Sequence, residues 1–301
     1  MFQEVWAAEL QIGHLSRLMD HIFIFEATKT FAGRDKFMYF KNYRSQMQCG
    51  LGKTTYVEVD DLPDVEQTAY IGSAGRPAPE NRWPLERAMR NAARRVIGHL
   101  PDDCVVYILD IDEVLAEPVF ETVDARIEDK QVIAFSLFDY RASIASSGFV
   151  KQPFTGGYAA RASTCKRNDI HFMRRFIIKD GKTVPSNFRL ALEPHEKHRP
   201  IHDFIEPDLN KLVIEEAGWH LSSMHGGYRQ YLESKVQNFA HSESWTKPGL
   251  VDAREDQYAA LKAFVLAQKT RYDYEDIDNN IPGFIRSYAQ EFPILLQLNP
   301  G

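Results

Sequence analysis

Two carboxylates, Asp110 and Asp112, follow directly on an apolar run at positions 105–109. A run of this kind predicts a buried strand, with parallel neighbours in an open α/β sheet. Such sheets bind their ligands at the carboxyl ends of the strands, where these two side chains would lie. Clustered carboxylates repel one another, and a hard divalent cation with oxygen ligands relieves that repulsion. The run therefore predicts a metal site at a sheet edge.

An Asp-x-Asp pair at the end of a strand fits two unrelated chemistries. In the first, the pair holds Mn²⁺ or Mg²⁺, and the cation neutralises charge on a departing nucleotide diphosphate. In the second, Asp110 is a nucleophile and Asp112 an acid–base group, as in haloacid-dehalogenase-like phosphatases, whose Asp-x-Asp-x-Val-Leu signature matches residues 110–115. Those phosphatases open with this strand, whereas residues 1–104 precede it here, so its position favours the first chemistry. A surface turn with two acids is the alternative that involves no ligand.

Helices and strands alternate in the first half of the chain. The spacing of apolar residues predicts an amphipathic helix over 4–19, and Pro84 opens a second helix that extends to about residue 99. Further strands are predicted over 21–26, 54–59 and 131–138. Glycine and proline predict a loop over 72–82 and a turn over 154–158. This alternation predicts an α/β fold with parallel strands.

The second half of the chain is less regular. The pattern over 170–178 does not decide between helix and strand, and residues 179–213 are rich in loop-forming types. Residues 210–216 lead into Gly218-Trp219-His220. Helices are predicted over 234–241 and 252–270, with a proline-containing tail behind them.

Composition is that of a globular protein. The 301 residues are 44% hydrophobic and 26% charged, and a net charge of −6 argues against a nucleic-acid partner. Three cysteines, Cys49, Cys104 and Cys165, do not suggest a disulfide framework or a zinc knuckle. No run approaches the ~20 apolar residues that span a bilayer, and the N-terminus lacks the pattern of a signal peptide. We therefore expect a soluble cytoplasmic protein without a membrane span.

Spaced motifs run almost from end to end of the chain. They are Glu4, Glu9 and Asp20 in the opening helix; the segments 23–33 and 56–63; Trp83, Glu86, Arg90 and Asn91; the segments 109–114 and 217–222; and Lys235 with residues 239–243. In this order they resemble glycosyltransferase family 17, whose animal members are β-1,4-mannosyl-glycoprotein N-acetylglucosaminyltransferases. Gln11 and Arg17 depart from the family pattern. Because the family carries a strand ahead of this opening, the first strand of the nucleotide-binding sheet is expected to be missing or trimmed here.

The resemblance implies a single GT-A domain over residues 1–301, built on a Rossmann-like, mostly parallel sheet flanked by helices. Residues 1–115 would form the nucleotide-sugar-binding half, and residues 116–301 an irregular acceptor half with C-terminal helices. It also implies an inverting, metal-dependent glycosyltransferase. The enzyme would use Mn²⁺ or Mg²⁺ to move a sugar from a UDP-sugar, UDP-N-acetylglucosamine in the family, onto an oligosaccharide or glycoconjugate acceptor. A catalytically inactive nucleotide-sugar-binding protein is the alternative from a different class.

The resemblance assigns roles to residues of this sequence. Asp112 would bind the metal, with Asp110 on the metal or the ribose. His220 would complete the shell or touch the diphosphate, although His225 and His241 compete with it. Glu113 would orient these acids or be a solvated loop acid. The donor would contact Glu26, Arg90, Asn91, Asp110 and Trp219. A loop anchor is the alternative for Glu26, a structural ion pair with Glu86 for Arg90, and a place in the core for Trp83.

An inverting transfer needs a general base beside the acceptor hydroxyl. The candidates are Asp139, Glu216 and Glu243. Glu216 is preferred because it adjoins the Trp219-His220 motif, and Asp139 is the second choice.

Overall fold

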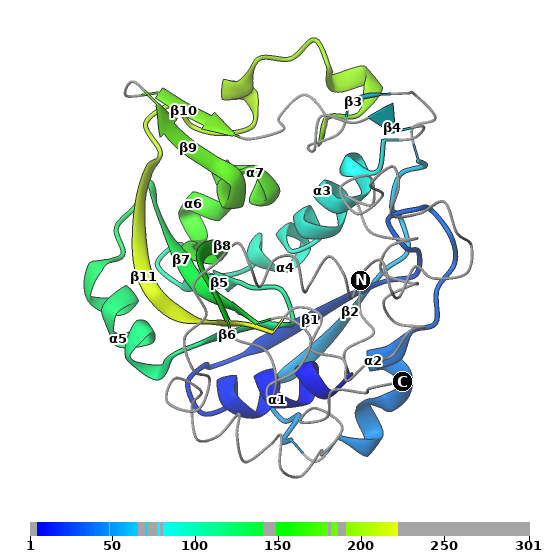
Figure 1. Ribbon diagram of the computed structural model, residues 1–301, viewed down its shortest axis with the longest axis vertical. Coiled ribbons are helices and arrows are strands. Elements are labelled where there is room, and N and C mark those ends of the chain that lie inside the picture. Colours follow the sequence, from blue (N-terminus) through cyan, green and yellow to red (C-terminus); the bar gives the residue numbers. More distant parts are fainter. Residues whose placement is uncertain are drawn as a thin grey trace.

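The computed structural model describes residues 5–47, 49–65, 70–71, 77–78, 81–140, 149–179, 182–185 and 191–221 (Figure 1). Its helices are α1 (Val5–Leu15), α2 (Tyr39–Tyr43), α3 (Trp83–Asn91), α4 (Arg94–Ile97), α5 (Glu117–Arg126), α6 (Ala162–Arg167) and α7 (Ile170–Arg175), with 3₁₀ turns η1 (Arg44–Gln46), η2 (Pro194–Glu196) and η3 (Ile201–Asp203). Its strands are β1 (Ile22–Ala27), β2 (Thr54–Val59), β3 (Tyr70–Ile71), β4 (Pro77–Ala78), β5 (Val105–Ile108), β6 (Glu113–Leu115), β7 (Gln131–Tyr140), β8 (Phe149–Arg161), β9 (Phe176–Lys179), β10 (Lys182–Pro185) and β11 (Asn210–His220). The helices predicted over 234–241 and 252–270, the tail, and His225, His241 and Glu243 lie outside the described residues.

The α/β class is confirmed, but the main sheet is mixed rather than mostly parallel. Its five strands lie in the order β5-β8-β7-β11-β6. Only the pair β7–β11 is parallel, and the other neighbouring pairs are antiparallel. A separate two-stranded parallel sheet joins β1 to β2 in register, with Glu26 opposite Glu58. The expectation that β5 has parallel neighbours is therefore wrong within the described residues, because its hydrogen-bonded partner is the antiparallel β8.

The five-stranded sheet curls, because β5 and β6 lie at its two opposite edges yet are joined by four residues. The backbone N–H of Glu113 donates to the carbonyl oxygen of Asp110 at 3.0 Å, closing a turn. Such a turn brings the Cα atoms of Asp110 and Glu113 within about 7 Å of each other. The two Cα–Cα steps from Ile108 to Asp110 add about 7 Å more, so β5 and β6 can be about 14 Å apart at most at this point. Four spacings between flat strands would need about 19 Å. The edges therefore approach one another at the acidic link.

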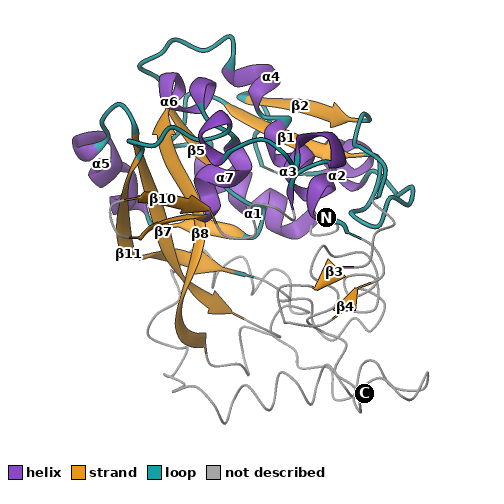
Figure 2. Ribbon diagram, turned by 90° about the horizontal axis from the view of Figure 1, so that it is seen from above, coloured by secondary structure: helices purple, strands orange, loops and turns teal. Residues whose placement is uncertain are grey.

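Both faces of this sheet are covered by helices, which explains why the run before Asp110 is apolar at every position. Val106 and Ile108 pack into a core with α3, α4, α6 and α7, while Val105 and Tyr107 pack into a second core with α5. Figures 1 and 2 show α5 on one face and α6 and α7 on the other. Trp83 is fully buried in the first core, as its core alternative predicts.

The predicted helix over 84–99 is two helices, α3 and α4, separated by a turn at residues 92–93. The N–H of Ala93 bonds to the carbonyl oxygen of Arg90, three residues back, instead of the residue four back. This tightening ends α3 and redirects the chain. Within the described residues, no helix has the length and apolarity that a membrane crossing requires.

The turn predicted over 154–158 is wrong, because these residues lie inside β8. Gly156 and Gly157 together oppose the single residue Phe135 of β7, which makes a β-bulge. A Cβ atom on Gly157 would lie 2.3 Å from the carbonyl oxygen of Ile108, and one on Gly156 would lie 3.1 Å from the carboxylate of Glu113. Glycine is needed here because another backbone and a buried acid approach closely.

Gly157→Ala is expected to destabilise the protein by about 1–3 kcal/mol, because backbone must move to admit the new methyl group. Urea unfolding measures this change. Gly52→Ala is the matched control, since no atom lies within 4 Å of the corresponding Cβ position, and it should change the free energy of unfolding by no more than about 0.5 kcal/mol. Equal effects of the two substitutions would contradict the close approach at Gly157.

Candidate functional site

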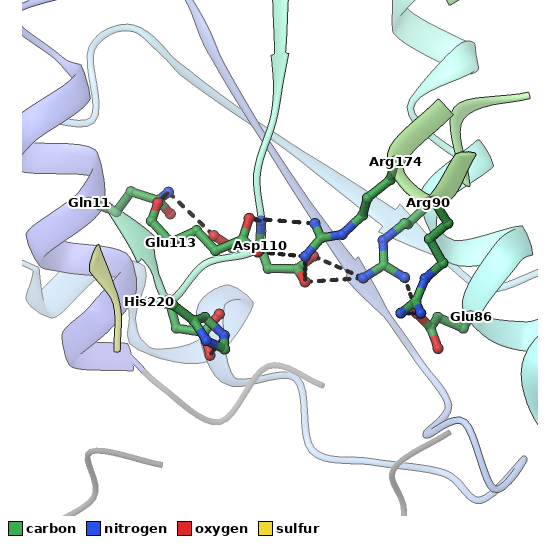
Figure 3. Close-up of polar contacts among 9 residues, drawn as sticks. Gln11, Glu86, Arg90, Asp110, Glu113, Arg174 and His220 are labelled. Carbon is green, nitrogen blue, oxygen red and sulfur yellow. Dashed lines mark hydrogen bonds and ion pairs between the residues drawn. The ribbon is translucent and has the colours of Figure 1, made fainter. Parts of the chain in front are cut away.

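Asp110 and Asp112 lie in the short link between β5 and β6, where the two edges of the sheet approach each other. Figure 3 shows Asp110 between Glu113 and Arg90. Glu113 follows as the first residue of β6 and is fully buried. One oxygen of its carboxylate accepts the backbone N–H of Asp110 at 2.8 Å. From α1, the amide of Gln11 donates to the carbonyl oxygen of Glu113 at 2.7 Å. These bonds fix the backbone that carries the two aspartates.

The alternative of a solvated loop acid for Glu113 does not fit this environment. Its carboxylate pairs with the guanidinium of Arg174 in α7, whose side chain is only 4% exposed. Burial raises the pKa of Glu113, while Arg174 lowers it and Asp110 raises it further. Glu113 thus ties the acidic link to α7, and its expected role in orienting the two aspartates stays a prediction.

Asp110 binds two guanidinium groups. Its carboxylate accepts Nη2 of Arg90 at 3.0 Å and lies 3.0 Å from Nη2 of Arg174. Burial alone would raise the pKa of Asp110, but Arg174 and Arg90 hold that pKa well below its ordinary value. The carboxylate is therefore ionised, with its charge already compensated by protein groups.

A second acid continues this network on α3. Glu86 binds the guanidinium of Arg90, four residues along the same helix, and that of Arg175 at 3.0 Å. The ion pair with Glu86 that was the alternative for Arg90 therefore exists, and Arg90 contacts Asp110 at the same time. Within the described residues, the buried Nε of Arg90 has no hydrogen-bond partner. Arg90 consequently retains one donor for a further acceptor.

Asp112 and His220 come together on the other side of the link. Nε2 of His220 lies 3.6 Å from Oδ2 of Asp112, and both side chains are largely buried. The pairing of β11 with β6 sets this proximity, because His220 is opposite Glu113 and the N–H of Leu221 donates to the carbonyl oxygen of Asp112 at 2.7 Å. This pairing brings the two backbones so close that residue 218 must be glycine, since a Cβ atom on Gly218 would lie 2.1 Å from the carbonyl oxygen of Val114.

The pair Asp112–His220 fits two positions of a divalent cation's shell. Mn²⁺ accepts both carboxylate oxygen and imidazole nitrogen. The part of the chain that the structure describes contains no group of three or more His, Cys, Asp or Glu residues able to hold a metal ion. Asp110, engaged by two arginines, is not in that pair. Within the described residues, and while Asp110 stays paired with the arginines, a cation bound to Asp112 and His220 would complete its shell with a bound anion and water.

Glu26 lies at the end of β1, as predicted, and its surroundings are those of a loop anchor. The carboxylate is fully buried and accepts Nζ of Lys36 at 3.2 Å and the hydroxyl of Tyr56 at 3.3 Å. It also accepts the backbone N–H groups of Phe40 and Lys41, at 3.3 and 3.2 Å, in the first turn of α2. Met38 provides no side-chain cap for this helix, so Glu26 satisfies its first donors.

The other two predicted donor contacts are Asn91, at the end of α3, and Trp219, which is opposite Val114 where β11 pairs with β6. The amide of Asn91 donates to Asp169 at 2.8 Å and accepts the N–H of Ile170 at 2.9 Å, at the start of α7. Trp219 is half-buried in β11 next to His220. Because successive side chains of a strand point to opposite faces, Trp219 faces away from the side that His220 shares with Asp112.

The two described candidates for a general base occupy different places. Asp139 in β7 is the register partner of His220, which puts its backbone beside the Asp112–His220 pair. Glu216 is exposed and lies four residues before His220, where the register of β11 shifts, with a backbone φ of 53°. A non-glycine residue rarely adopts such a conformation.

Arg174 and Gln11 are the site residues that the sequence did not reveal. Arg174 falls in the segment 170–178, whose helix or strand character the pattern left undecided. A sequence signal does exist, because Arg174 and Arg175 interrupt the mainly apolar stretch 170–178, whose first five residues are buried in α7. Buried arginines require partners, so such a pair indicates nearby acids.

Near this network lies His171 of α7, which the sequence did not single out. Its ring is fully buried, 6.5 Å from the ring of Trp83, and both ring nitrogens are without hydrogen-bond partners within the described residues. Burial lowers the pKa of His171 well below 6.5, although Glu86 partly opposes the shift. The imidazole is therefore neutral in the folded protein.

The free energy of unfolding is expected to fall as the pH falls below about 6.5, because the unfolded chain then binds a proton that folded His171 does not. One such group gives a slope of up to about 1.4 kcal/mol per pH unit. Burial also lowers the pKa of His14, so the wild type and His171→Leu are compared by urea unfolding between about pH 5.5 and 7.5. The variant should lose part of the slope, and identical slopes would contradict a buried neutral His171.

Searches of protein-family models, of curated proteins and of solved structures found no match for this chain. The resemblance to glycosyltransferase family 17 therefore stays a prediction that rests on the motifs themselves.

Proposed function

We propose that the protein is a metal-dependent glycosyltransferase that uses a nucleotide-sugar donor. The observation that carries this proposal is the division of the Asp-x-Asp link. Asp112 faces an imidazole 3.6 Å away, while Asp110 faces the guanidinium groups of Arg90 and Arg174. Two side chains that suit a divalent cation and two arginines that suit a phosphate group therefore lie next to the same turn of chain.

Within this proposal each group has a chemical role. Asp112 and His220 would hold Mn²⁺ or Mg²⁺, which supplies neutralising charge for the departing diphosphate when it is bound. Arg90 and Arg174 suit the same diphosphate, because a guanidinium group donates two parallel hydrogen bonds to phosphate oxygens. Glu113 and Gln11 hold the link in place through Arg174 and the backbone. Glu26 stabilises the loop that follows β1 and has no proposed contact with the donor.

Asp139 is the proposed general base, because its backbone lies beside His220 whereas Glu216 lies four residues away. The base would accept the proton of the acceptor hydroxyl as its oxygen attacks the anomeric carbon and the nucleotide diphosphate leaves. This displacement inverts the configuration at that carbon. The family resemblance supports UDP-N-acetylglucosamine as donor and a glycan as acceptor.

The experiment is a panel of nucleotide sugars incubated with the protein and Mn²⁺, with and without EDTA, while released nucleotide diphosphate is measured. We expect release from one donor, UDP-N-acetylglucosamine first, and its loss in EDTA. A panel of glycans is then tested as acceptors with that donor, and the release of nucleotide diphosphate is measured again. Asp139→Asn should bind the donor normally and turn over slowly.

Two other outcomes would replace the proposal. Phosphate release from a generic phosphomonoester, without diphosphate release from any donor, would assign the haloacid-dehalogenase-like phosphatase chemistry with Asp110 as nucleophile. Calorimetric binding of a nucleotide sugar without turnover on any acceptor would assign a catalytically inactive binding protein.

A further inference from the structure

Asp110 covers the two arginines that the proposed function assigns to the diphosphate. Its side chain is 41% exposed, whereas those of Arg90 and Arg174 behind it are 14% and 4% exposed. Figure 3 shows both guanidinium groups directed at this one carboxylate. An anion that approaches from the side of Asp110 therefore meets its carboxylate before it reaches either guanidinium group.

Release of Asp110 is unfavourable unless another anion takes its place. Arg174 would keep Glu113, and Arg90 would keep Glu86, but each would lose one of its two charged partners. Buried guanidinium groups that lose a carboxylate are poorly solvated, which penalises the separation. A metal ion alone, by recruiting Asp110, would impose that loss on both arginines. An arriving diphosphate restores their charge compensation.

We propose that Asp110 is an anion-operated latch: it closes the Arg90–Arg174 site until a diphosphate displaces it, and the displaced carboxylate then becomes available to the metal. The inference rests on the proposed function and adds a binding order to it. Metal and diphosphate bind with positive coupling, because each stabilises the arrangement that the other requires. Arg174 is thereby a binding residue for the diphosphate as well as a partner of Glu113.

The unused donor of Arg90 supports this assignment independently. Its Nε is buried and has no hydrogen-bond partner within the described residues, although both terminal nitrogens of the group are engaged. A carboxylate has two oxygens, and those of Asp110 are shared between two arginines. A diphosphate offers more acceptor oxygens and can serve the additional donor.

The test uses inorganic pyrophosphate, which carries the charged group of the donor without the nucleoside or sugar. Its affinity is measured by calorimetry in EDTA for the wild type, Asp110→Asn and Asp112→Asn. Each substitution removes one negative charge from the same turn, but only Asp110 covers the arginines. Asp110→Asn is expected to bind pyrophosphate at least about fivefold more tightly than the wild type, and Asp112→Asn to stay within about twofold of it.

The latch is refuted if the two variants change pyrophosphate affinity equally, or if Asp110→Asn binds it no more tightly than the wild type. Asp110→Ser is a second variant without the covering carboxylate, and it should also bind pyrophosphate more tightly than the wild type. Thermal unfolding followed by circular dichroism verifies that each variant is folded. UDP with Mn²⁺ is measured on the same proteins. Tight UDP binding without the Asp110 effect would overturn the latch and leave the proposed function in place. If Asp110→Asn binds pyrophosphate more tightly but no nucleotide or nucleotide sugar binds to any of the proteins, the latch stands and the proposed function is overturned.

Discussion

Asp112→Ala is expected to lower Mn²⁺-dependent turnover of the nucleotide sugar by about 10²–10³-fold, the range found when a group that stabilises transition-state charge is removed. The reason is local, because Asp112 is the carboxylate that faces His220 at 3.6 Å. Loss of its oxygen leaves one protein ligand of the proposed pair. Steady-state release of nucleotide diphosphate measures turnover, and Mn²⁺ titration followed by electron paramagnetic resonance measures binding of the ion.

Asp124→Ala is the matched control for this substitution. Asp124 is an exposed acid on α5, so its removal takes away the same charge without touching the acidic link. Turnover and Mn²⁺ affinity of the control should remain close to wild type. Undiminished Mn²⁺ binding by Asp112→Ala would remove the metal from this turn of chain.

Arg174→Met is expected to destabilise the protein by about 3–5 kcal/mol, because it leaves the carboxylate of Glu113 buried without its cation. Glu113 is fully buried, and the guanidinium of Arg174 is the ion-pair partner that the structure gives it. The free energy of unfolding in urea measures the loss. The double variant Arg174→Met/Glu113→Gln should recover most of it, since the amide carries no charge yet still accepts the N–H of Asp110.

An exposed arginine provides the comparison. Arg167 pairs with Asp129 at 2.8 Å and Glu206 at 3.0 Å, and its side chain is 37% exposed. Surface ion pairs contribute little, so Arg167→Met should cost about 1 kcal/mol or less. A similar loss for Arg174→Met would mean that Glu113 finds other compensation.

Periodicity predicted the individual strands well because it reports how side chains are buried. The strands expected over 21–26, 54–59 and 131–138 correspond to β1, β2 and β7, and the apolar run before Asp110 is β5. The direction of neighbouring strands does not follow from burial. An apolar residue at every position indicates that both faces are covered, which α5 and α7 achieve here for an antiparallel pair. The expectation of parallel neighbours failed for this reason.

Glycines produced the second error in the fold. The pair Gly156-Gly157 has the composition of a turn, and its meaning depends on what lies opposite. The opposing groups are the carboxylate of Glu113 and the carbonyl oxygen of Ile108, which are more than forty positions away in sequence. A local pattern carries no information on such a contact.

The same distinction between local sequence patterns and contacts between distant residues applies to the candidate site. Asp110, Asp112, His220 and Arg90 were predicted, and the structure brings them to one turn of chain. The roles of Arg174 and Gln11 depend on α7 and α1 packing against that turn, which no spacing rule encodes. Glu26 and Asn91 were predicted as donor contacts, whereas their hydrogen bonds are those of α2 and α7. Polar residues at strand and helix ends serve both purposes, and sequence does not separate them.

The link between β5 and β6 differs from an ordinary surface loop in its tolerance of length changes. Loops usually accept insertions because their ends are held by separate, independently paired elements. Here the link joins β5 directly to β6, and these are the two edge strands of the same sheet. One additional residue would shift β5 or β6 by one position and turn every side chain of the shifted strand to the opposite face. Glu113 would then leave Arg174, so the spacing of the two aspartates is set by the closure of the sheet as much as by the ligand they would bind.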